Sequence, residues 1–415
     1  EKFDQMRHYH PLPHKKGIER NGIMCRSKMA SNASNPKRYL FSPHSRQSWQ
    51  ESPSSILAGT SYPSSSGTNS TDPSSSSSGH SSRSSLRGSV SRNPNIYSSA
   101  EIRSATNNFL AKPYSSSSKC WRCSLRGADT IVFQRKFAQK LSSSEIKRRL
   151  AVVCKSNHSS VVNLLGAAVS GEYIYLVYEF IPGANLANCL RNRSNPNFTV
   201  LSTWMSRIRV IADVAHALDY IHHKTGLKIS LVHKYMKSSG IMISDDSLSA
   251  KLCHFGAAYL CGEESGGEGE KLFEGVRGFM SPEYRATGVA SQESDVYAFG
   301  VVVLEAVSGE EAYKYEYDKK TKEFVRWSVI EGAMEALERG RFRGWVDRRL
   351  KDSFPVDVAE KLARLALECV DGDSSRRPNM SRVAGKLSML LLSSEAWCQQ
   401  MTANQTQMSV SLAPR

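Results

Sequence analysis

The chain has 415 residues, 40% of them apolar, and its 55 lysines and arginines against 39 aspartates and glutamates give a net charge of +16. This length accommodates two or three domains, or one large domain with tails. The longest apolar run, residues 299–307, contains Glu305 and is far shorter than the ~20 residues that a membrane-spanning helix needs, so the sequence predicts no such helix.

The cysteines indicate a reduced protein. There are nine, an odd number, spread from Cys25 to Cys398. This usage is typical of an intracellular chain rather than of a disulfide framework. Cys120 and Cys123 form the one CxxC pair. Because a zinc site needs a second pair at comparable spacing, we expect no metal site there.

Residues 1–100 have the composition of a disordered region. Residues 51–100 include 21 serines and almost no apolar periodicity, so they cannot bury enough surface to offset the entropy of ordering. Residues 1–100 also carry 13 basic and 5 acidic residues. A basic tail can contact a membrane surface or nucleic acid, but these charges are spread out and lack aromatic residues between them, which favours a solvated linker.

The start of the chain suggests a second hypothesis. Met24 is followed by Cys25, Arg26 and Lys28. Whether Glu1 or Met24 is the true first residue stays open. If it is Met24, palmitoylation of Cys25 would give peripheral membrane contact, although one lipid and a few charges anchor a protein only marginally. We see no secretory signal peptide.

From Glu101 to about Leu392 the sequence has the periodicity of a globular domain. Strand patterns occupy residues 130–133, 161–169 and 173–180. Helical spacing occupies residues 101–109, 144–153, 204–222, 295–308, 358–370 and 380–392. We therefore predict an α+β domain at 101–392, with a small β-rich lobe at 106–181 and a larger helical lobe at 182–392, followed by a flexible tail at 393–415.

Six short motifs follow one another in this domain. They are YLVYEFIPGANL from Tyr175, LVHKYMKSSGIMI from Leu231, KLCHFGAAYL from Lys251, GFMSPEY from Gly278, SDVYAFGVVVLEAVSG from Ser294 and SSRRPNM from Ser374. In this order they resemble the hinge, catalytic loop, magnesium-binding segment, end of the activation segment, first large helix and last landmark of a protein kinase. The residues of these motifs, together with EIRSATNNF at residues 101–109, resemble those of plant receptor-like and receptor-like cytoplasmic kinases, including those related to LysM receptors. The resemblance implies a two-lobed protein-kinase-like fold.

The residues that would perform phosphoryl transfer depart from this family. Tyr235 stands at the catalytic aspartate, Gly240 at the metal-binding asparagine and His254 at the aspartate of D-F-G. A phenol cannot accept a proton as a carboxylate does, and a neutral imidazole suits Mg²⁺ poorly because that ion prefers oxygen ligands. Asp245 and Asp246 follow a strand and are expected to face solvent. We therefore expect no intact catalytic residue and no magnesium ligands here.

The phosphate-binding lysine is also in doubt. Gln134, Arg135 and Lys136 compete for its position, and local spacing favours Gln134, which would leave the site without its cation. Arg135 and Lys136 remain weak candidates for binding ATP. The glutamate that partners this lysine falls on Arg149, with Glu145 one helical turn earlier as a poorer candidate.

The loop that covers the nucleotide in this family is glycine-rich, because glycine lets backbone N–H groups approach phosphates. This chain has KPYSSSSKCWRCSLRG at residues 112–127, with glycine only at its end. The four serines could bond a phosphate, but the composition favours a bulkier, mobile loop.

The family's structural positions are kept. The resemblance implies that they brace the fold and shape the cleft without requiring chemistry. They are Glu283 and Arg377 (an ion pair), Asp295 (holding the catalytic loop), His233 and Phe255 (the apolar spine) and Met242 (the floor of the adenine pocket).

The activation segment, residues 257–280, contains GEESGGEGE and no threonine. Tyr259 and Ser265 are its obvious hydroxyls, and Lys234 stands at the arginine that would receive a loop phosphate. We expect a mobile acidic loop without the usual phosphorylation switch.

Selective loss of catalytic groups predicts a pseudokinase that acts as a scaffold or allosteric partner of receptor-like kinases or other signalling proteins. We expect it in the cytoplasm, and peripheral contact with the plasma membrane stays open. One alternative is a weakly active Ser/Thr protein kinase that transfers phosphate from ATP. Another is a membrane-surface or nucleic-acid binder that uses the basic tail, although nucleic acid is not expected without a basic helix or aromatic platform. No cofactor is certain, and ATP binding without magnesium stays open.

Overall fold

The computed structural model describes residues 94–411, except 116–117, 193, 195–198, 227–230, 264–277, 320 and 352, with side chains described up to residue 403. The predictions for residues 1–93, including Cys25, and for Ser265 lie outside the described residues. Every cysteine in the described part is a free thiol.

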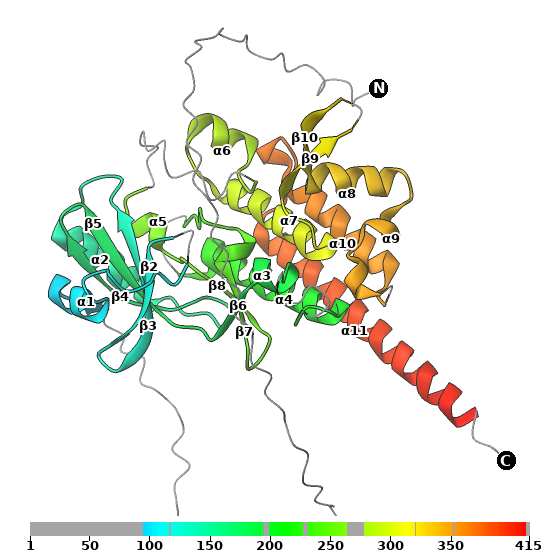
Figure 1. Ribbon diagram of the computed structural model, residues 1–415, viewed down its shortest axis with the longest axis horizontal. Coiled ribbons are helices and arrows are strands. Elements are labelled where there is room, and N and C mark those ends of the chain that lie inside the picture. Colours follow the sequence, from blue (N-terminus) through cyan, green and yellow to red (C-terminus); the bar gives the residue numbers. More distant parts are fainter. Residues whose placement is uncertain are drawn as a thin grey trace, which may run out of the picture. The chain divides into compact units, whose positions relative to one another are not determined.

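The smaller lobe is built on a five-stranded sheet (Figure 1). Its order is β1-β4-β5-β3-β2, and all neighbours are antiparallel except β1 and β4. The strands are β1 (Asn95–Ile96), β2 (Cys120–Leu125), β3 (Ala128–Lys136), β4 (Leu164–Ser170) and β5 (Tyr173–Glu179). Val132 and Val177 bury one face with the short helix α1 (Ser99–Ala105), while Phe133 and Leu176 face the main core beside helix α2 (Ser143–Lys155). Period-two alternation of apolar residues therefore gives this sheet two packed faces.

The ordered domain begins earlier than the sequence analysis placed it. Asn95 and Ile96 pair with Gly166 and Ala167 of β4. Ser98 caps α1 by a capping box, in which the Ser98 hydroxyl accepts from the Glu101 N–H. Residues 94–100 thus belong to the folded domain, and the prediction that they are disordered is wrong.

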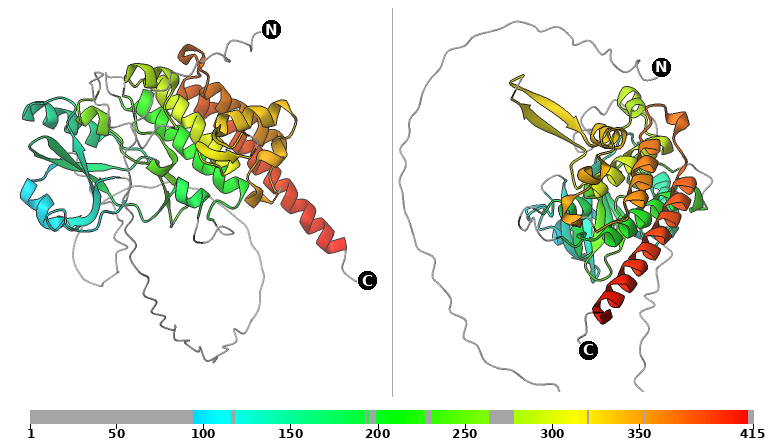
Figure 2. Two further views of the ribbon diagram at one scale, coloured as in Figure 1. Left: turned by 45° about the horizontal axis from the view of Figure 1, so that its top comes forward. Right: turned by 90° about the vertical axis from the view of Figure 1, so that its right-hand side faces the viewer.

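The larger lobe is helical (Figure 2). Its helices are α3 (Leu186–Leu190), α4 (Trp204–Asp219), α5 (Ala257–Leu260), α6 (Pro282–Thr287), α7 (Gln292–Ser308), α8 (Val329–Glu338), α9 (Phe342–Trp345), α10 (Val356–Cys369) and α11 (Met380–Ser411). Shorter turns lie at Tyr220–Lys224, Ser238–Gly240, Arg348–Leu350 and Ser374–Arg376. The sheet β6-β7-β8 (Gly183–Asn185, Ile241–Ser244, Ala250–Leu252) faces the cleft, and a hairpin of β9 (Tyr313–Asp318) and β10 (Glu323–Ser328) follows α7. Helix α7 is the centre of the lobe, since all its residues from Ser294 onward are buried.

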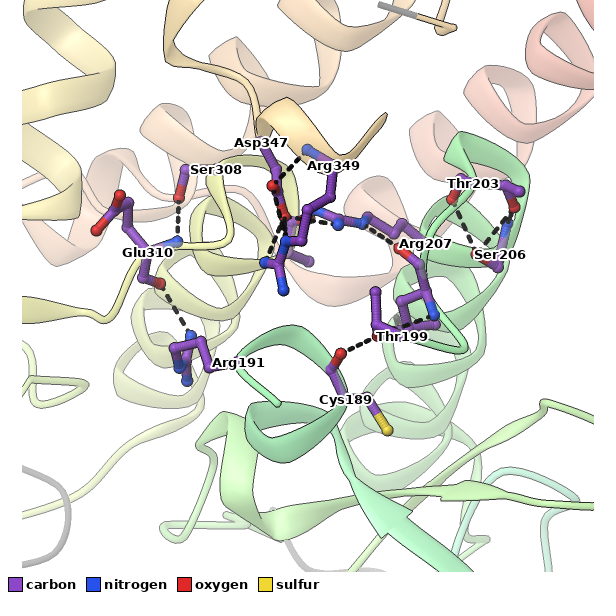
Figure 3. Close-up of polar contacts among 12 residues, drawn as sticks. Cys189, Arg191, Thr199, Thr203, Ser206, Arg207, Ser308, Glu310, Asp347 and Arg349 are labelled. Atoms are coloured by element: carbon purple, nitrogen blue, oxygen red, sulfur yellow. Dashed lines mark hydrogen bonds and ion pairs between the residues drawn. The ribbon is translucent and has the colours of Figure 1, made fainter. Parts of the chain in front are cut away.

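A buried arginine ties three helical segments together (Figure 3). Arg207 of α4 donates to the carbonyls of Leu201 and Ala306 and to a carboxylate oxygen of Asp347, at 2.7, 2.9 and 2.6 Å. Arg349 covers the same carboxylate. Because every charge in this cluster is paired, the network can remain in the core without an unsatisfied ion.

The last helix is longer than expected. Helix α11 continues past Leu392 to Ser411, and the indole N–H of Trp204 donates to the buried hydroxyl of Ser394 at 2.8 Å. The prediction of a flexible tail from residue 393 is therefore wrong. No helix within the described ranges combines the length and the apolarity that a membrane span requires.

Candidate functional site

A cavity of about 420 Å³ lies between the two lobes. It is lined by β2 and β3 above, by residues 178–181 at the side and by residues 235–254 below. Met242, matched to the floor of an adenine pocket, lies in this lining. The only carboxylate among the described lining residues is Glu179, whose oxygens accept from Asn163 and Lys251. The described lining thus lacks a free acidic pair for a divalent cation.

Basic side chains supply the charge of the cavity. Arg135 and Lys237 line it, and the Arg135 guanidinium lies 4.4 Å from the ring centroid of Tyr235. Burial, reinforced by the charge of Arg135, lowers the pKa of Lys237. Lys119 is a third cation in the lining.

Arg135 is the residue by which β3 presents a cation to the cleft, whereas the sequence had favoured the neutral Gln134 at this position. The Gln134 amide reaches the Tyr175 hydroxyl, and Lys136 pairs with Glu172 at 3.1 Å with both side chains exposed. Alternation along the strand explains this, because Phe133 and Arg135 share the face toward the cleft. Gln134 also lines the cavity, but because its amide turns to Tyr175 the structure favours Arg135 over the expected Gln134, and Lys136 is not a lining residue.

Tyr235, at the position of the catalytic base, is held by a carboxylate. Its buried hydroxyl donates to Glu263 at 2.6 Å from each oxygen, and the Lys234 ammonium lies 2.8 Å from the same group. Burial is the main cause that raises the pKa of Tyr235 well above 10. The charge of Arg135 lowers this pKa, and the charge of Glu263 raises it further. A phenol that is protonated and already donating cannot act as a general base. We call Lys234, Tyr235 and Glu263 the Glu263 clamp.

His254 occupies the position of the metal-binding aspartate. Its ring packs edge-on against Phe133 with centroids 4.7 Å apart, and its buried Nδ1 has no hydrogen-bond partner among the described residues. Burial, followed by the charge of Arg135, lowers the pKa of His254 well below 6.5, so the imidazole is neutral. Gly240 lies beside it, since a Cβ there would be 3.9 Å from His254 Cδ2. The structure therefore brings Tyr235, Gly240 and His254 together without a metal-binding oxygen from their side chains.

Helix α2 is anchored by an arginine in place of a glutamate. Arg149 is buried, donates to the carbonyl of Tyr259 at 2.5 Å and pairs with Glu145 at 2.7 Å. Glu145 also binds Arg148 through both oxygens. Glu145 is thus engaged by two arginines of its own helix, and Arg149 has no carboxylate, so neither residue serves as the partner of the cation on β3. Helix α2 instead holds α5 of the activation segment through Arg149.

The scaffold beneath the site matches the sequence prediction. Asp295 accepts from the backbone N–H groups of His233 and Lys234 at 2.6 and 2.8 Å. The buried His233 ring contacts the Cys253 carbonyl, and Phe255 lies in the main core. The structural roles expected for Asp295, His233 and Phe255 agree with these contacts.

The bracing ion pair is also present. Arg377 donates to both oxygens of Glu283 at 2.7 and 2.8 Å. Burial opposes ionisation of Glu283, but the hydrogen bonds from Arg377 outweigh it and lower the pKa of this carboxyl to about 2. Asp245 and Asp246 are exposed, as predicted.

Sequence reasoning missed two residues of this site, Lys237 and Glu263. Glu263 belongs to the acidic run GEESGGEGE, which was interpreted as mobile, yet its side chain is buried. In the serine-rich loop, Ser115 and Ser118 pair across a bridge and line the cavity, and residues 116–117 between them lie outside the description.

Comparison with known proteins identifies the fold and the family. The model of protein tyrosine and serine/threonine kinases matches residues 130–387. The chain is 33% identical over 317 residues to LysM domain receptor-like kinase 3 and 31% identical over 306 residues to Protein LYK5, both from Arabidopsis thaliana. Each alignment covers 73% of this chain, but 47% and 44% of the relatives.

A solved structure agrees with this fold. The pseudokinase domain of BIR2, described as an immune regulator of the RLK/Pelle family, superposes with a TM-score of 0.55 at 24% identity, covering 70% of this chain and 85% of that one. The two-lobed α+β kinase fold predicted from the sequence is confirmed.

The chain belongs to the protein tyrosine and serine/threonine kinase family. Within it, the chain is a member of the plant receptor-like kinase group, as its motifs indicated. It spans less than half the length of these two relatives.

Proposed function

We propose that this kinase domain is catalytically impaired and acts as a scaffold or allosteric partner in receptor-kinase signalling. The observation that carries the proposal is the Glu263 clamp, because the group at the position of the catalytic base is a phenol bound to a carboxylate of the same chain. A lost general base costs about 10²–10⁴ in rate, and loss of a charge-stabilising group costs about 10²–10³. These losses do not multiply cleanly, but both affect the same step.

The described residues fit a nucleotide's phosphates better than they fit magnesium. Arg135, Lys237 and Lys119 present cations to the cavity, and Met242 lies in its lining. The oxygen ligands that Mg²⁺ requires are not offered by Gly240 or by the neutral imidazole of His254. We therefore propose that any ATP binding is independent of magnesium and leads to no transfer.

The test measures binding and transfer separately on the full chain. Thermal shift with ATP, with and without Mg²⁺, should give the same stabilisation, and Arg135→Ala should abolish it. Incubation with γ-labelled ATP and a generic peptide should give no incorporation above a blank. Metal-dependent incorporation that changes in Tyr235→Phe would overturn the proposal in favour of a weakly active Ser/Thr kinase.

The partner class rests on family membership. Relatives of the chain include proteins named as receptor-like kinases, so we propose active receptor-like kinases as partners, at the cytoplasmic face of the plasma membrane. Co-purification of the full chain with a panel of receptor kinase domains tests this proposal. If a Gly240→Asn/His254→Asp variant still binds, the scaffold role does not depend on the altered cleft. If the wild-type chain binds none of the receptor kinase domains, the proposed partner class is contradicted.

A further inference from the structure

The β9–β10 hairpin presents an unusual aromatic face. Tyr315, Tyr317 and Phe324 are 63%, 53% and 71% exposed, whereas most other tyrosines of the described chain are buried. Tyr317 and Phe324 are cross-strand partners with ring centroids 5.4 Å apart, and Tyr315 is opposite Arg326. Figure 2 shows the hairpin, in yellow, extending away from the helices of the lobe. Aromatic residues thus cover one face of a projecting two-stranded ribbon.

One edge of β9 has no strand partner among the described residues. Within the described residues, β10 is the only strand that neighbours β9. Such an edge has backbone N–H and C=O groups that can pair with another strand. The β9 sequence YKYEYD alternates tyrosines on the aromatic face with charged residues on the other face. The charged residues allow the occupant of this edge to be inferred.

We propose that β9 pairs antiparallel with β9 of a second copy of this chain, about a twofold axis at Tyr315. In an antiparallel pair, two residues that lie opposite one another have side chains on the same face of the sheet. Because side chains alternate between the faces, a twofold axis perpendicular to the sheet meets this condition only when it passes beside a residue and not midway between two residues. Within one chain Lys314 pairs with Glu316 and Glu310 at 2.7 and 3.0 Å. With the axis at Tyr315, Lys314 also lies opposite Glu316 of the second copy, twice, so each ion pair extends across the dimer. The same register places Tyr313 opposite Tyr317 of the second copy, so the aromatic faces become continuous.

Other registers are less favourable. An axis at Lys314 or Glu316 places like charges directly opposite each other, which destabilises a strand pair. Pairing through β10 (EFVRWS) about Val325 gives no opposite-charge pair, and an axis at Arg326 opposes two arginines. Self-complementarity of charge therefore singles out β9 and Tyr315, in an isologous dimer. The ribbon buries little area, so we expect a weak dimer.

The first test uses charge reversal and light scattering of the full chain over a range of concentrations. Wild type should dimerise, and Lys314→Glu or Glu316→Lys alone should weaken the dimer roughly tenfold, because two attractive pairs become repulsive. The double exchange Lys314→Glu/Glu316→Lys should restore it, and a mixture of the two single variants should form the heterodimer. Wild type that stays monomeric, or a dimer indifferent to these charges, would overturn the proposal.

The second test locates the axis by a disulfide. In the proposed register Tyr315→Cys places two cysteines in direct cross-strand contact, within the range that a disulfide spans. Tyr317→Cys is the matched control on the same face, since its two copies would be about 14 Å apart along the strands. Mild oxidation should cross-link Tyr315→Cys through residue 315, identified by mass spectrometry, and should leave Tyr317→Cys uncross-linked at residue 317. The reverse outcome, or cross-linking of neither, refutes this register.

Discussion

Replacing Tyr235 by phenylalanine should weaken the fold and release the start of the activation segment. The Tyr235 hydroxyl donates to both oxygens of a carboxylate whose side chain is only 3% exposed. A hydrogen bond to a charged group contributes about 1.5–3 kcal/mol. Because Lys234 remains paired with Glu263 in this variant, we expect the free energy of unfolding to fall by an amount near the middle of that range, about 2 kcal/mol.

Urea unfolding followed by circular dichroism measures this loss. A double-mutant cycle with Glu263→Gln should give a coupling energy of about 1–2 kcal/mol, since the two side chains contact each other directly. Hydrogen exchange supplies the local readout, because the Glu263 N–H donates to the Ala258 carbonyl at 3.0 Å and should lose protection when the clamp opens. Tyr173→Phe, a surface phenol, is the matched control and should stay within about 0.5 kcal/mol of wild type.

The reasoning fails if the two substitutions are additive. Additivity would mean that Tyr235 and Glu263 do not interact in solution, and the activation segment would then be held by other contacts. Unchanged hydrogen exchange at residues 258–263 in Tyr235→Phe would lead to the same conclusion. Either result would also remove the observation on which the proposed loss of catalysis rests.

Three further predictions concern the scaffold. Asp347→Ala leaves the guanidinium of Arg207 buried without its carboxylate and should cost about 3–5 kcal/mol in urea unfolding, and a loss under 1 kcal/mol would show that the network is not stabilising. Gly256→Ala should lower the free energy of unfolding more than Gly340→Ala. Both glycines have a positive φ, but only at Gly256 would a Cβ approach a valine of α2, to 2.5 Å. Equal losses in urea unfolding would contradict this. The pKa of Glu283 is lowered from 4.5 to about 2, so its contribution, of order 2 kcal/mol, is complete above pH 4.5 and is lost as the pH falls toward 2. Glu283→Gln should therefore be less stable than wild type at pH 6 and approach it near pH 2, as measured by urea unfolding at each pH.

The sequence predicted the order and type of most elements because their periodicity is strong. The apolar spacing of residues 204–222 became α4 and the turn that continues it, and residues 130–133 became the centre of β3. The hairpin β9–β10 was not predicted, since its strands face solvent and lack a buried apolar face to reveal them. The end of α11 was missed for a similar reason, because its polar residues beyond Leu392 carry little apolar periodicity.

The site was predictable where a motif fixes a position and not where tertiary contacts decide. Tyr235, Gly240 and His254 followed from spacing, and the structure brings them together. The choice among residues 134–136 depended on which face of β3 meets the cleft, and strand alternation from Phe133 could have settled it in favour of Arg135. The contact of Glu263 with Tyr235 spans 28 residues of chain, and no local pattern encodes it.

The carboxylates of this domain divide by what they hold. Asp295 binds backbone N–H groups of the catalytic loop and Glu283 binds Arg377, so both stabilise the fold without any ligand. Glu263 receives Tyr235, and thus its charge also stabilises the domain and is not offered to a metal. Under the proposed function, a cavity that retains cations while its acidic groups are engaged elsewhere would attract a phosphate without neutralising a triphosphate through magnesium. The proposal therefore separates binding from transfer, and an assay that measures ATP binding alone does not test catalysis.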